Sequence, residues 1–128
     1  FGTVSKRPRR CGWLDIPLLR YAVRLNGVTS LAITKLDVLT GIDELKVCIG
    51  YRYHGKILLE FPSEISRLPD CIPVYKTMSG WKKDIGGIRR RSDFPKQTTA
   101  YLSFIEKKLG VPIHYISVGA ERKALIRS

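Results

Sequence analysis

The chain has 128 residues, of which 23 are Lys or Arg and 11 are Asp or Glu, so its formal net charge is +12. Hydrophobic residues make up 44% of it, too many for an intrinsically disordered protein. The length suits one domain or part of one, and no apolar run reaches the roughly 18 residues of a membrane-spanning helix. The excess of cations predicts an anionic partner.

The start of the chain carries a second clue. It begins with Phe1 rather than Met, shows no signal-peptide pattern, and contains a single methionine, Met78. Because strand-like sequence stands just before a basic loop, we expect a piece of a longer protein.

The cysteines and histidines predict no metal site. No Cys-x-x-Cys pair occurs, and the two histidines lie far apart without a neighbouring ligand pattern. We expect reduced intracellular thiols, with Cys48 packed inside a strand.

The first predicted elements are a basic loop, a helix and a strand. Residues 1–12 form the loop, and Asp15 caps a helix that starts at Ile16. Apolar residues recur there at helical spacing, and Gly27 ends the helix because glycine adopts the left-handed cap conformation easily. Residues 31–33 (Leu-Ala-Ile) predict a short, fully buried strand.

A hairpin is predicted next. Large apolar side chains alternate over residues 47–53, as in a half-exposed strand, and His54-Gly55 forms a tight turn. Apolar residues return on one face from Ile57 to Phe61. Residues 62–73 predict a loop with a short helical turn, and residues 74–77 predict another strand.

The last third predicts an irregular segment, a helix and a strand. Glycines and a run of arginines make residues 79–93 irregular. A helix begins near Pro95 and stops at Gly110, and residues 113–118 form the final strand. Helix followed by strand, twice, with a hairpin excursion, predicts an α/β fold. The expected buried stripe of the helix, at 3-4-3 spacing and flanked by Leu102 and Leu109, is Tyr101, Phe104, Ile105 and Lys108.

The first candidate site is the basic loop. Residues 6–10, Lys-Arg-Pro-Arg-Arg, hold four cations around a proline, and arginine pairs bidentately with carboxylate or phosphate. The loop can therefore be an anion clamp, a nucleic-acid arm or a solvated basic tail. Gly-Trp-Leu-Asp at residues 12–15 argues against a loose tail, because a Trp and a helix cap fix the loop to a folded body.

The second candidate site is Thr34-Lys35-Leu36-Asp37, directly after the predicted strand. This arrangement suits guanine, whose N1–H and N2 amino group present two adjacent donors to one carboxylate. Adenine lacks that paired donor edge, and the Lys stem can lie along the base. Strand carboxyl ends are where open α/β sheets bind ligands. A strand-end ion pair is the alternative.

The third candidate site is Ser117-Val118-Gly119, at the end of the last strand. Glycine lets the backbone approach a ligand closely, and a plain glycine turn is the alternative. The two strand ends would form one base pocket if they meet. The chain contains no phosphate-binding Gly-x-x-x-x-Gly-Lys-Ser/Thr loop, because Gly86-Gly87 is followed by Ile88-Arg89.

Several stretches together resemble the adenylosuccinate synthetase family, specifically its C-terminal part. The resemblance runs nearly from end to end, and the Arg-rich loop that leads into Gly-Trp-Leu-Asp is its most specific element. The stretches that carry it are residues 7–15, 31–39 (Leu-Ala-Ile-Thr-Lys-Leu-Asp-Val-Leu), 80–85 (Gly-Trp-Lys-Lys-Asp-Ile), and 110–113 (Gly-Val-Pro-Ile) through 117–119.

The resemblance implies a GTP-dependent ligase of purine biosynthesis, which joins IMP and L-aspartate to adenylosuccinate through a 6-phosphoryl-IMP intermediate, with Mg²⁺ bridging the anions. Residues 1–128 would be the C-terminal portion of a larger, mostly parallel-sheet, P-loop NTPase-like domain. The catalytic Asp and His, the phosphate loop and the Mg²⁺ ligands would lie outside this chain. The isolated chain is therefore expected to be inactive, with no catalytic or metal-binding residue assigned in it.

By matching positions, the resemblance also assigns binding residues. Arg7 would contact IMP as well as belong to the aspartate loop, and Arg9 would also face GTP. The aspartate loop would be Thr3, Val4, Ser5, Lys6, Arg7, Pro8 and Arg9. The guanine pocket would be Lys35, Leu36 and Asp37 together with Ser117, Val118 and Gly119. The family is usually a cytoplasmic homodimer, with no nucleic-acid or membrane partner.

Three departures from the family pattern bear on these assignments. Lys6 stands where Gly is usual, and a bulky side chain disfavours backbone conformations that Gly takes easily. Ala120 and Glu121 replace the usual Pro and Asp beside the predicted guanine pocket. Two alternatives to the ligase interpretation stay open: a basic nucleic-acid-binding module, and an inactive remnant of the fold. The run Arg89 to Arg91 has no predicted ligand.

Overall fold

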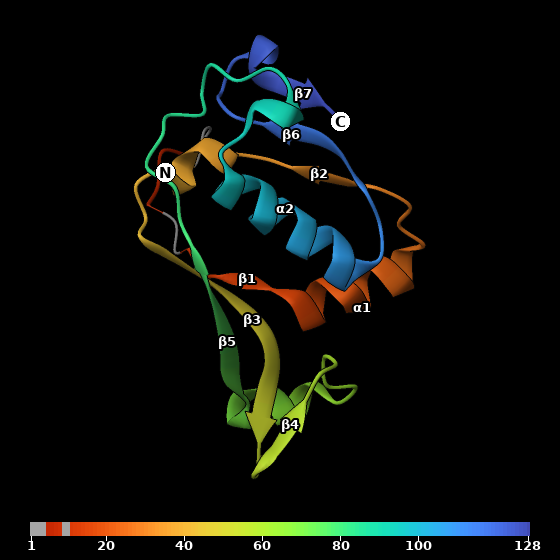
Figure 1. Cartoon of the computed structure of the whole chain (residues 1–128). Coiled ribbons are helices and arrows are strands. Elements are labelled where there is room, and N and C mark those ends of the chain that lie inside the picture. The colour runs from red at the N-terminus through yellow and green to blue at the C-terminus, as the bar shows by residue number, and fades with distance from the viewer. Residues whose placement is uncertain (1–4, 9–10) are drawn as a thin grey trace.

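The computed structural model describes residues 5–8 and 11–128. These residues form both helices and strands, so the predicted α/β class is confirmed. In chain order they are β1 (Leu14–Asp15), α1 (Ile16–Asn26), β2 (Leu31–Ile33), β3 (Glu44–Tyr53), β4 (Lys56–Leu58), β5 (Ile72–Ser79), α2 (Lys96–Leu109), β6 (Ile113–Ser117) and β7 (Leu125–Arg127) (Figure 1). Short 3₁₀ helices lie in the connections, namely η1 (Leu36–Leu39), η2 (Ile65–Asp70), η3 (Arg91–Asp93) and η4 (Arg122–Ala124).

Helix α1 begins and ends at the predicted residues. The Asp15 carboxylate accepts a hydrogen bond from the backbone N–H of Leu18 at 3.0 Å, and Pro17 lies in the first turn. At the other end Gly27 has a left-handed φ of 61°, and its N–H donates to the carbonyl of Val23. Both terminal turns are thus satisfied by the residue types that the sequence provides there.

The strands form two small sheets. In the first, β5 pairs antiparallel along one edge of β3, and β1 (parallel) and β4 (antiparallel) pair with its other edge. In the second, β6 lies between β2, which runs parallel to it, and the antiparallel β7. The turn between β3 and β4 consists of His54 and Gly55, which have φ values of 48° and 82°.

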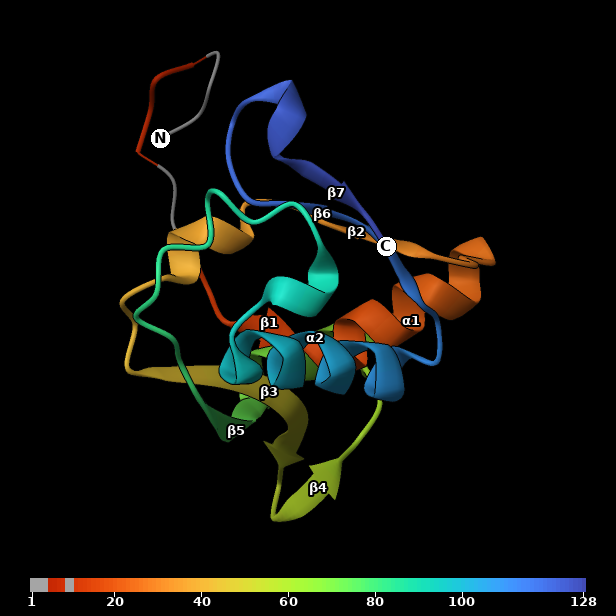
Figure 2. The same ribbon diagram turned by 45° about the horizontal axis from the view of Figure 1, so that its top comes forward.

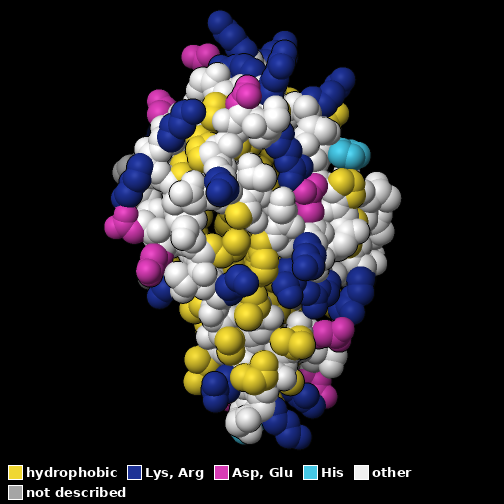
Figure 3. All heavy atoms as spheres, in the orientation of Figure 1, with side chains coloured by type: hydrophobic (Ala, Val, Ile, Leu, Met, Phe, Trp, Pro, Cys, Tyr) yellow, Lys and Arg dark blue, Asp and Glu magenta, His cyan; other side chains and the backbone are white. Residues whose placement is uncertain are grey.

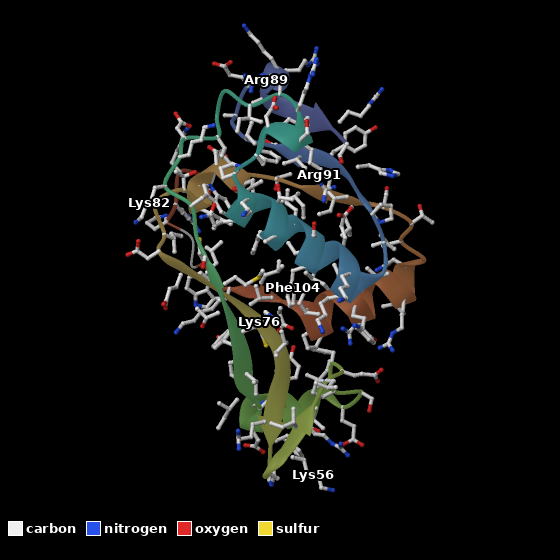
Figure 4. All side chains as sticks on the ribbon, viewed as in Figure 1. Lys56, Lys76, Lys82, Arg89, Arg91 and Phe104 are labelled. Atoms are coloured by element: carbon white, nitrogen blue, oxygen red, sulfur yellow. The ribbon has the colours of Figure 1, made fainter. Side chains whose placement is uncertain are left out.

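Helix α2 lies between the two sheets and carries the centre of the core (Figures 1 and 2). Its buried residues are Thr98, Tyr101, Leu102, Ile105 and Leu109. The predicted stripe was therefore wrong in part, because Phe104 is half-buried and Lys108 is exposed. Phe104 lies where α2 meets β5, and the ammonium groups of Lys76 and Lys108 lie 5.1 and 5.7 Å from the centre of its ring (Figure 4).

Strand β2 is not fully buried, contrary to the prediction. Leu31 and Ile33 are half-buried and Ala32 is exposed. Among the described residues β2 pairs only with β6, so its other edge is open. A cavity of about 460 Å³ borders it, lined by apolar side chains of β2, α1 and α2 that include Leu19 and Ile105. Water therefore reaches a strand whose composition is typical of a sheet covered on both faces.

Other strand limits also differ from the prediction. β4 ends at Leu58, whereas the prediction continued it to Phe61. Instead of pairing with β3, Phe61 packs its ring 5.6 Å from that of Tyr21 in α1. β3 and β5 extend beyond their predicted limits, and β7 was not predicted.

Hydrophobic side chains are exposed along the middle and lower part of the molecule, over β3, β4 and β5, with Lys and Arg around them (Figure 3). Exposed hydrophobic residues in this region are Ile57, Leu59, Ile65 and Ile72. None of the helices in the described part of the chain is long and apolar enough to cross a membrane.

Candidate functional site

The basic loop is described for residues 5–8, all of which are exposed. The backbone N–H of Arg7 donates to the hydroxyl of Ser5 at 3.4 Å, which closes a local turn. Thr3, Val4 and Arg9 of the predicted aspartate loop lie outside the described residues. The loop (red) lies at the same end of the molecule as the turn (orange) that follows β2 (Figures 1 and 2).

Lys6 has a backbone φ of 56°, in the left-handed region that favours glycine. The resemblance placed a usual glycine at this position, so the backbone conformation agrees with that pattern although the residue does not. A non-glycine residue in this region costs about 1 to 2 kcal/mol. Lys6 therefore does not prevent this conformation but makes it strained.

The predicted guanine motif forms a tight turn after β2. Lys35 is left-handed, with a φ of 57°, and precedes η1. Leu36 is only 1% exposed and fixes the turn to the core, whereas Lys35 is exposed and Asp37 is half-buried. The N–H of Val38 donates to the Lys35 carbonyl at 3.2 Å, and that of Thr40 to the Asp37 carbonyl at 3.1 Å. The two charged side chains of the motif, Lys35 and Asp37, therefore flank the buried Leu36.

The segment Ser117–Gly119 follows β6. The hydroxyl of Ser117 donates to the Gly119 carbonyl at 2.9 Å, and the N–H of Val118 donates to the Ala124 carbonyl at 3.0 Å. Val118 is buried, so this segment too is fixed to the core by one apolar side chain. A Cβ at Gly119 would lie 3.1 Å from the Cβ of Ala124, a tight contact that a larger residue could make only if Ala124 shifted slightly.

Strand pairing brings these two segments together. β2 and β6 are parallel neighbours, with Ile33 opposite Ile116, and the two segments leave the sheet at the same carboxyl edge. The 460 Å³ cavity is also lined by Cys11 and Gly12, which end the basic loop, and by Lys35. The structure thus gathers the end of the basic loop and both strand-end motifs around one end of β2, the position where α/β sheets bind ligands.

A contact behind the guanine motif was not predicted as part of the site. Trp81 is 2% exposed, and its indole Nε1–H donates to the hydroxyl oxygen of Thr40 at 3.0 Å. The backbone N–H of Gly41 donates to the Trp81 carbonyl at 2.8 Å. The only sequence signal for this contact was that Gly80-Trp81 belongs to the stretches that carry the family resemblance.

The arginine run acts within the fold. Arg91 makes a forked ion pair with Glu106, and one of its nitrogens lies 3.1 Å from the hydroxyl of Ser128 (Figure 4). Its guanidinium lowers the pKa of the Glu106 carboxyl, whose Oε2 also accepts the N–H of Ile113 at 2.8 Å. Arg89 bonds carbonyls of its own loop, at 2.8 and 3.0 Å. Arg89 therefore stabilises its own loop, and Arg91 ties η3 to helix α2.

Lys82 and Asp43, near the Thr40 segment, form an exposed ion pair. Lys82 pairs with Asp43 and lowers the pKa of that carboxyl, and its ammonium group also donates to the Gly41 carbonyl at 3.2 Å. Within residues 5–8 and 11–128, no group of three or more His, Cys, Asp or Glu side chains is arranged to hold a metal ion.

Comparison with known proteins decides the family. The family model for adenylosuccinate synthetase matches residues 1–126 of the chain. The chain belongs to the adenylosuccinate synthetase family. Similar sequences include the adenylosuccinate synthetases of Halothermothrix orenii, 51% identical over 127 residues, and Thermodesulfovibrio yellowstonii, 52% identical over 126 residues. These alignments cover 99% and 98% of this chain.

The same family is found among solved structures. The fully ligated adenylosuccinate synthetase from Plasmodium falciparum matches with a TM-score of 0.93 and 40% sequence identity over 100% of this chain. That match covers 31% of the Plasmodium chain, and the chain spans 30% of the length of both bacterial relatives. The resemblance stated from the sequence is therefore confirmed at the level of the family.

Proposed function

We propose that this chain supplies the guanine pocket and the aspartate and IMP loop of an adenylosuccinate synthetase. The observation that carries the proposal is the pairing of β2 with β6, which places the segments after Ile33 and after Ile116 side by side. Each segment alone is a weak motif. Their adjacency, in a chain of this family, supports a single base pocket at the edge of the sheet.

Asp37 would select guanine. Its carboxylate is acceptor-only and would receive both the N1–H and the N2 amino group of the base. Adenine presents no such pair of donors, so its binding would leave a half-buried carboxylate unsatisfied. The exposed stem of Lys35 would cover one face of the base, and the backbone of Ser117 to Gly119 would border another side.

The basic loop would bind the other anions. Ser5, Lys6, Arg7 and Pro8, with Thr3, Val4 and Arg9, would close on the carboxylates of aspartate, because arginine forks match carboxylate and phosphate geometry. Arg7 would also reach IMP, and Arg9 would face GTP. The exposure of Ser5 to Pro8 supports this role, because a loop that grips a small substrate has to be accessible.

The whole reaction would then be the GTP-dependent joining of IMP and L-aspartate to adenylosuccinate, in purine biosynthesis. The catalytic carboxylate, the catalytic histidine, the phosphate loop and the Mg²⁺ ligands would come from sequence outside residues 1–128. The residues of this chain would bind and orient the substrates. We further propose a cytoplasmic homodimer for the complete enzyme, with no nucleic-acid or membrane partner.

Nucleotide titration of the 128-residue chain, followed by amide chemical shifts in NMR, tests the guanine pocket. We expect GDP to shift the signals of residues 34–40 and 117–119. The affinity for ADP in the same titration should be at least tenfold lower, since a hydrogen bond to a charged group is worth about 1.5 to 3 kcal/mol. Asp37→Ala should abolish the preference, and Asp93→Ala in η3 is the matched control. Equal shifts with GDP and ADP would refute the pocket.

Two further assays address activity and the nucleic-acid alternative. Purified chain supplied with IMP, GTP, aspartate and Mg²⁺ should form no adenylosuccinate, and measurable turnover would overturn that expectation. The net charge of +12 motivates the alternative. Tight RNA or DNA binding with a steep salt dependence, together with no guanine preference, would favour the nucleic-acid module instead.

A further inference from the structure

The turn that carries Lys35 and Asp37 contains a strained residue. Lys35 adopts a left-handed conformation, with a φ of 57°, although it has a full side chain. Such conformations persist only where the surrounding structure fixes them, and they gather at ligand sites. The contacts that fix this turn therefore decide how the two side chains are aimed.

One contact is the buried anchor Leu36, and the next lies at the end of η1. Thr40 donates its backbone N–H to the Asp37 carbonyl at 3.1 Å and accepts the indole N–H of Trp81 on its hydroxyl at 3.0 Å. Gly41 donates to the Trp81 carbonyl at 2.8 Å. Trp81 thus binds residues 40 and 41, just after the guanine motif, through both its side chain and its backbone.

Trp81 is itself fixed in place. Its side chain is buried beside the ring of Tyr101 in α2, with ring centres 6.1 Å apart. The N–H of Gly80 donates to the Asp43 carbonyl at 2.9 Å. A Cβ at Gly80 would lie 1.7 Å from the carbonyl oxygen of Ile42, so only glycine allows residues 80–81 to lie this close to residues 40–43. A rigid partner therefore supports the turn.

We propose that Trp81 and Thr40 are positioning residues for guanine recognition: their hydrogen bond holds the strained Lys35 turn so that Asp37 faces the base. The inference rests on the proposed function, since it concerns the same pocket. It assigns part of the specificity for guanine to two residues, Thr40 and Trp81, that would not touch the nucleotide.

Amide hydrogen exchange tests the contact in the free chain. Thr40→Val removes the acceptor with little change of shape, and Thr40→Ser keeps it. In Thr40→Val the amide of Val38, which bonds to Lys35, should exchange about fivefold faster, as expected for the loss of one net hydrogen bond. In Thr40→Ser it should stay within about twofold, and the amide of Ile105 in α2 should be unchanged in both. Equal exchange of Val38 in the two variants would overturn the proposal.

The ratio of GDP to IDP (inosine diphosphate) affinity tests the positioning role. IDP lacks the 2-amino group from which Asp37 would accept a hydrogen bond. We expect Thr40→Val to lower this ratio at least threefold and Thr40→Ser to keep it; a second variant, Trp81→Phe, should behave like Thr40→Val. If the wild-type chain prefers GDP but Thr40→Val keeps the wild-type ratio, this inference fails alone. If the wild-type chain shows no preference for guanine, the proposed pocket fails, and this inference fails with it.

Discussion

The hydroxyl group of Tyr51 in β3 donates to the carboxylate of Asp15, whose two oxygens lie 2.6 and 2.7 Å from it. The same carboxylate caps α1 by accepting the N–H of Leu18. Burial of the ring, and then the adjacent carboxylate, raise the pKa of the Tyr51 hydroxyl, so it keeps its proton and remains a donor. One side chain thus ties the start of α1, a few residues after the basic loop, to the central strand of the first sheet.

Tyr51→Phe should therefore destabilise the chain. The substitution keeps the ring but leaves a partly buried carboxylate with one donor fewer, and a hydrogen bond to a charged group contributes about 1.5 to 3 kcal/mol. We expect the free energy of unfolding to fall by about that amount in urea denaturation. Tyr75→Phe in β5 is the control, because Tyr75 is 43% exposed, and it should change the free energy of unfolding by less than about 0.5 kcal/mol. Equal effects of the two substitutions would contradict the role given to Tyr51.

Gly80→Ala tests the close approach behind the guanine motif. The added Cβ would lie 1.7 Å from the carbonyl oxygen of Ile42, and a backbone oxygen cannot turn away as a flexible side chain can. We expect a loss of more than about 2 kcal/mol in the free energy of unfolding, measured by urea denaturation. Gly87→Ala is the control, because no atom lies within 4 Å of a Cβ there. A tolerated Gly80→Ala would show that residues 42 and 80 can separate without cost.

Local signals predicted the elements whose ends are set by single residues. The limits of α1 follow from the Asp15 cap and the Gly27 terminus, and both are local chemistry. β7 was missed because Leu125–Arg127 is too short to show a periodic pattern, and its pairing with β6 decides its conformation. The burial of β2 was overestimated because an apolar composition cannot show whether a second layer is present to cover it.

The candidate site shows the same division. Thr34 to Asp37 and Ser117 to Gly119 could be identified from residue types, but their meeting depends on a strand pair separated by some eighty residues of sequence. The Thr40–Trp81 contact was out of reach for the same reason. Sequence indicates which groups can do chemistry. The strand order determines which of them share a pocket.

Glu106→Gln should change how stability depends on acidity. The Arg91 guanidinium lowers the pKa of Glu106 below its ordinary value of 4.5, so the ionised carboxylate stabilises the fold above that value and this contribution is lost as the pH falls through the lowered pKa. The variant should be less stable than wild type at neutral pH, and the difference should shrink as the pH drops below about 4.5.

Urea denaturation from neutral pH down to about 3 measures this dependence. Glu44→Gln in β3 is the control, because Glu44 is exposed, and its difference from wild type should be smaller and vary less with pH. If the difference between wild type and Glu106→Gln stays constant over the range, the Arg91 pair does not set the pKa of Glu106.

Lys35→Gly should separate stability from recognition. Glycine relieves the left-handed strain at φ 57°, which costs a lysine about 1 to 2 kcal/mol, but it also adds unfolded-state entropy worth about 0.5 to 1 kcal/mol. We expect a net gain of about 0.5 kcal/mol in the free energy of unfolding. Lys46→Gly, in the extended backbone of β3, is the matched control and should lose about 1 kcal/mol.

The same Lys35→Gly chain should bind GDP more weakly in the NMR titration, because the stem that would cover the base is gone. A residue that is strained for the sake of binding predicts these opposite signs, and a loss in both measurements would show that Lys35 serves the fold instead.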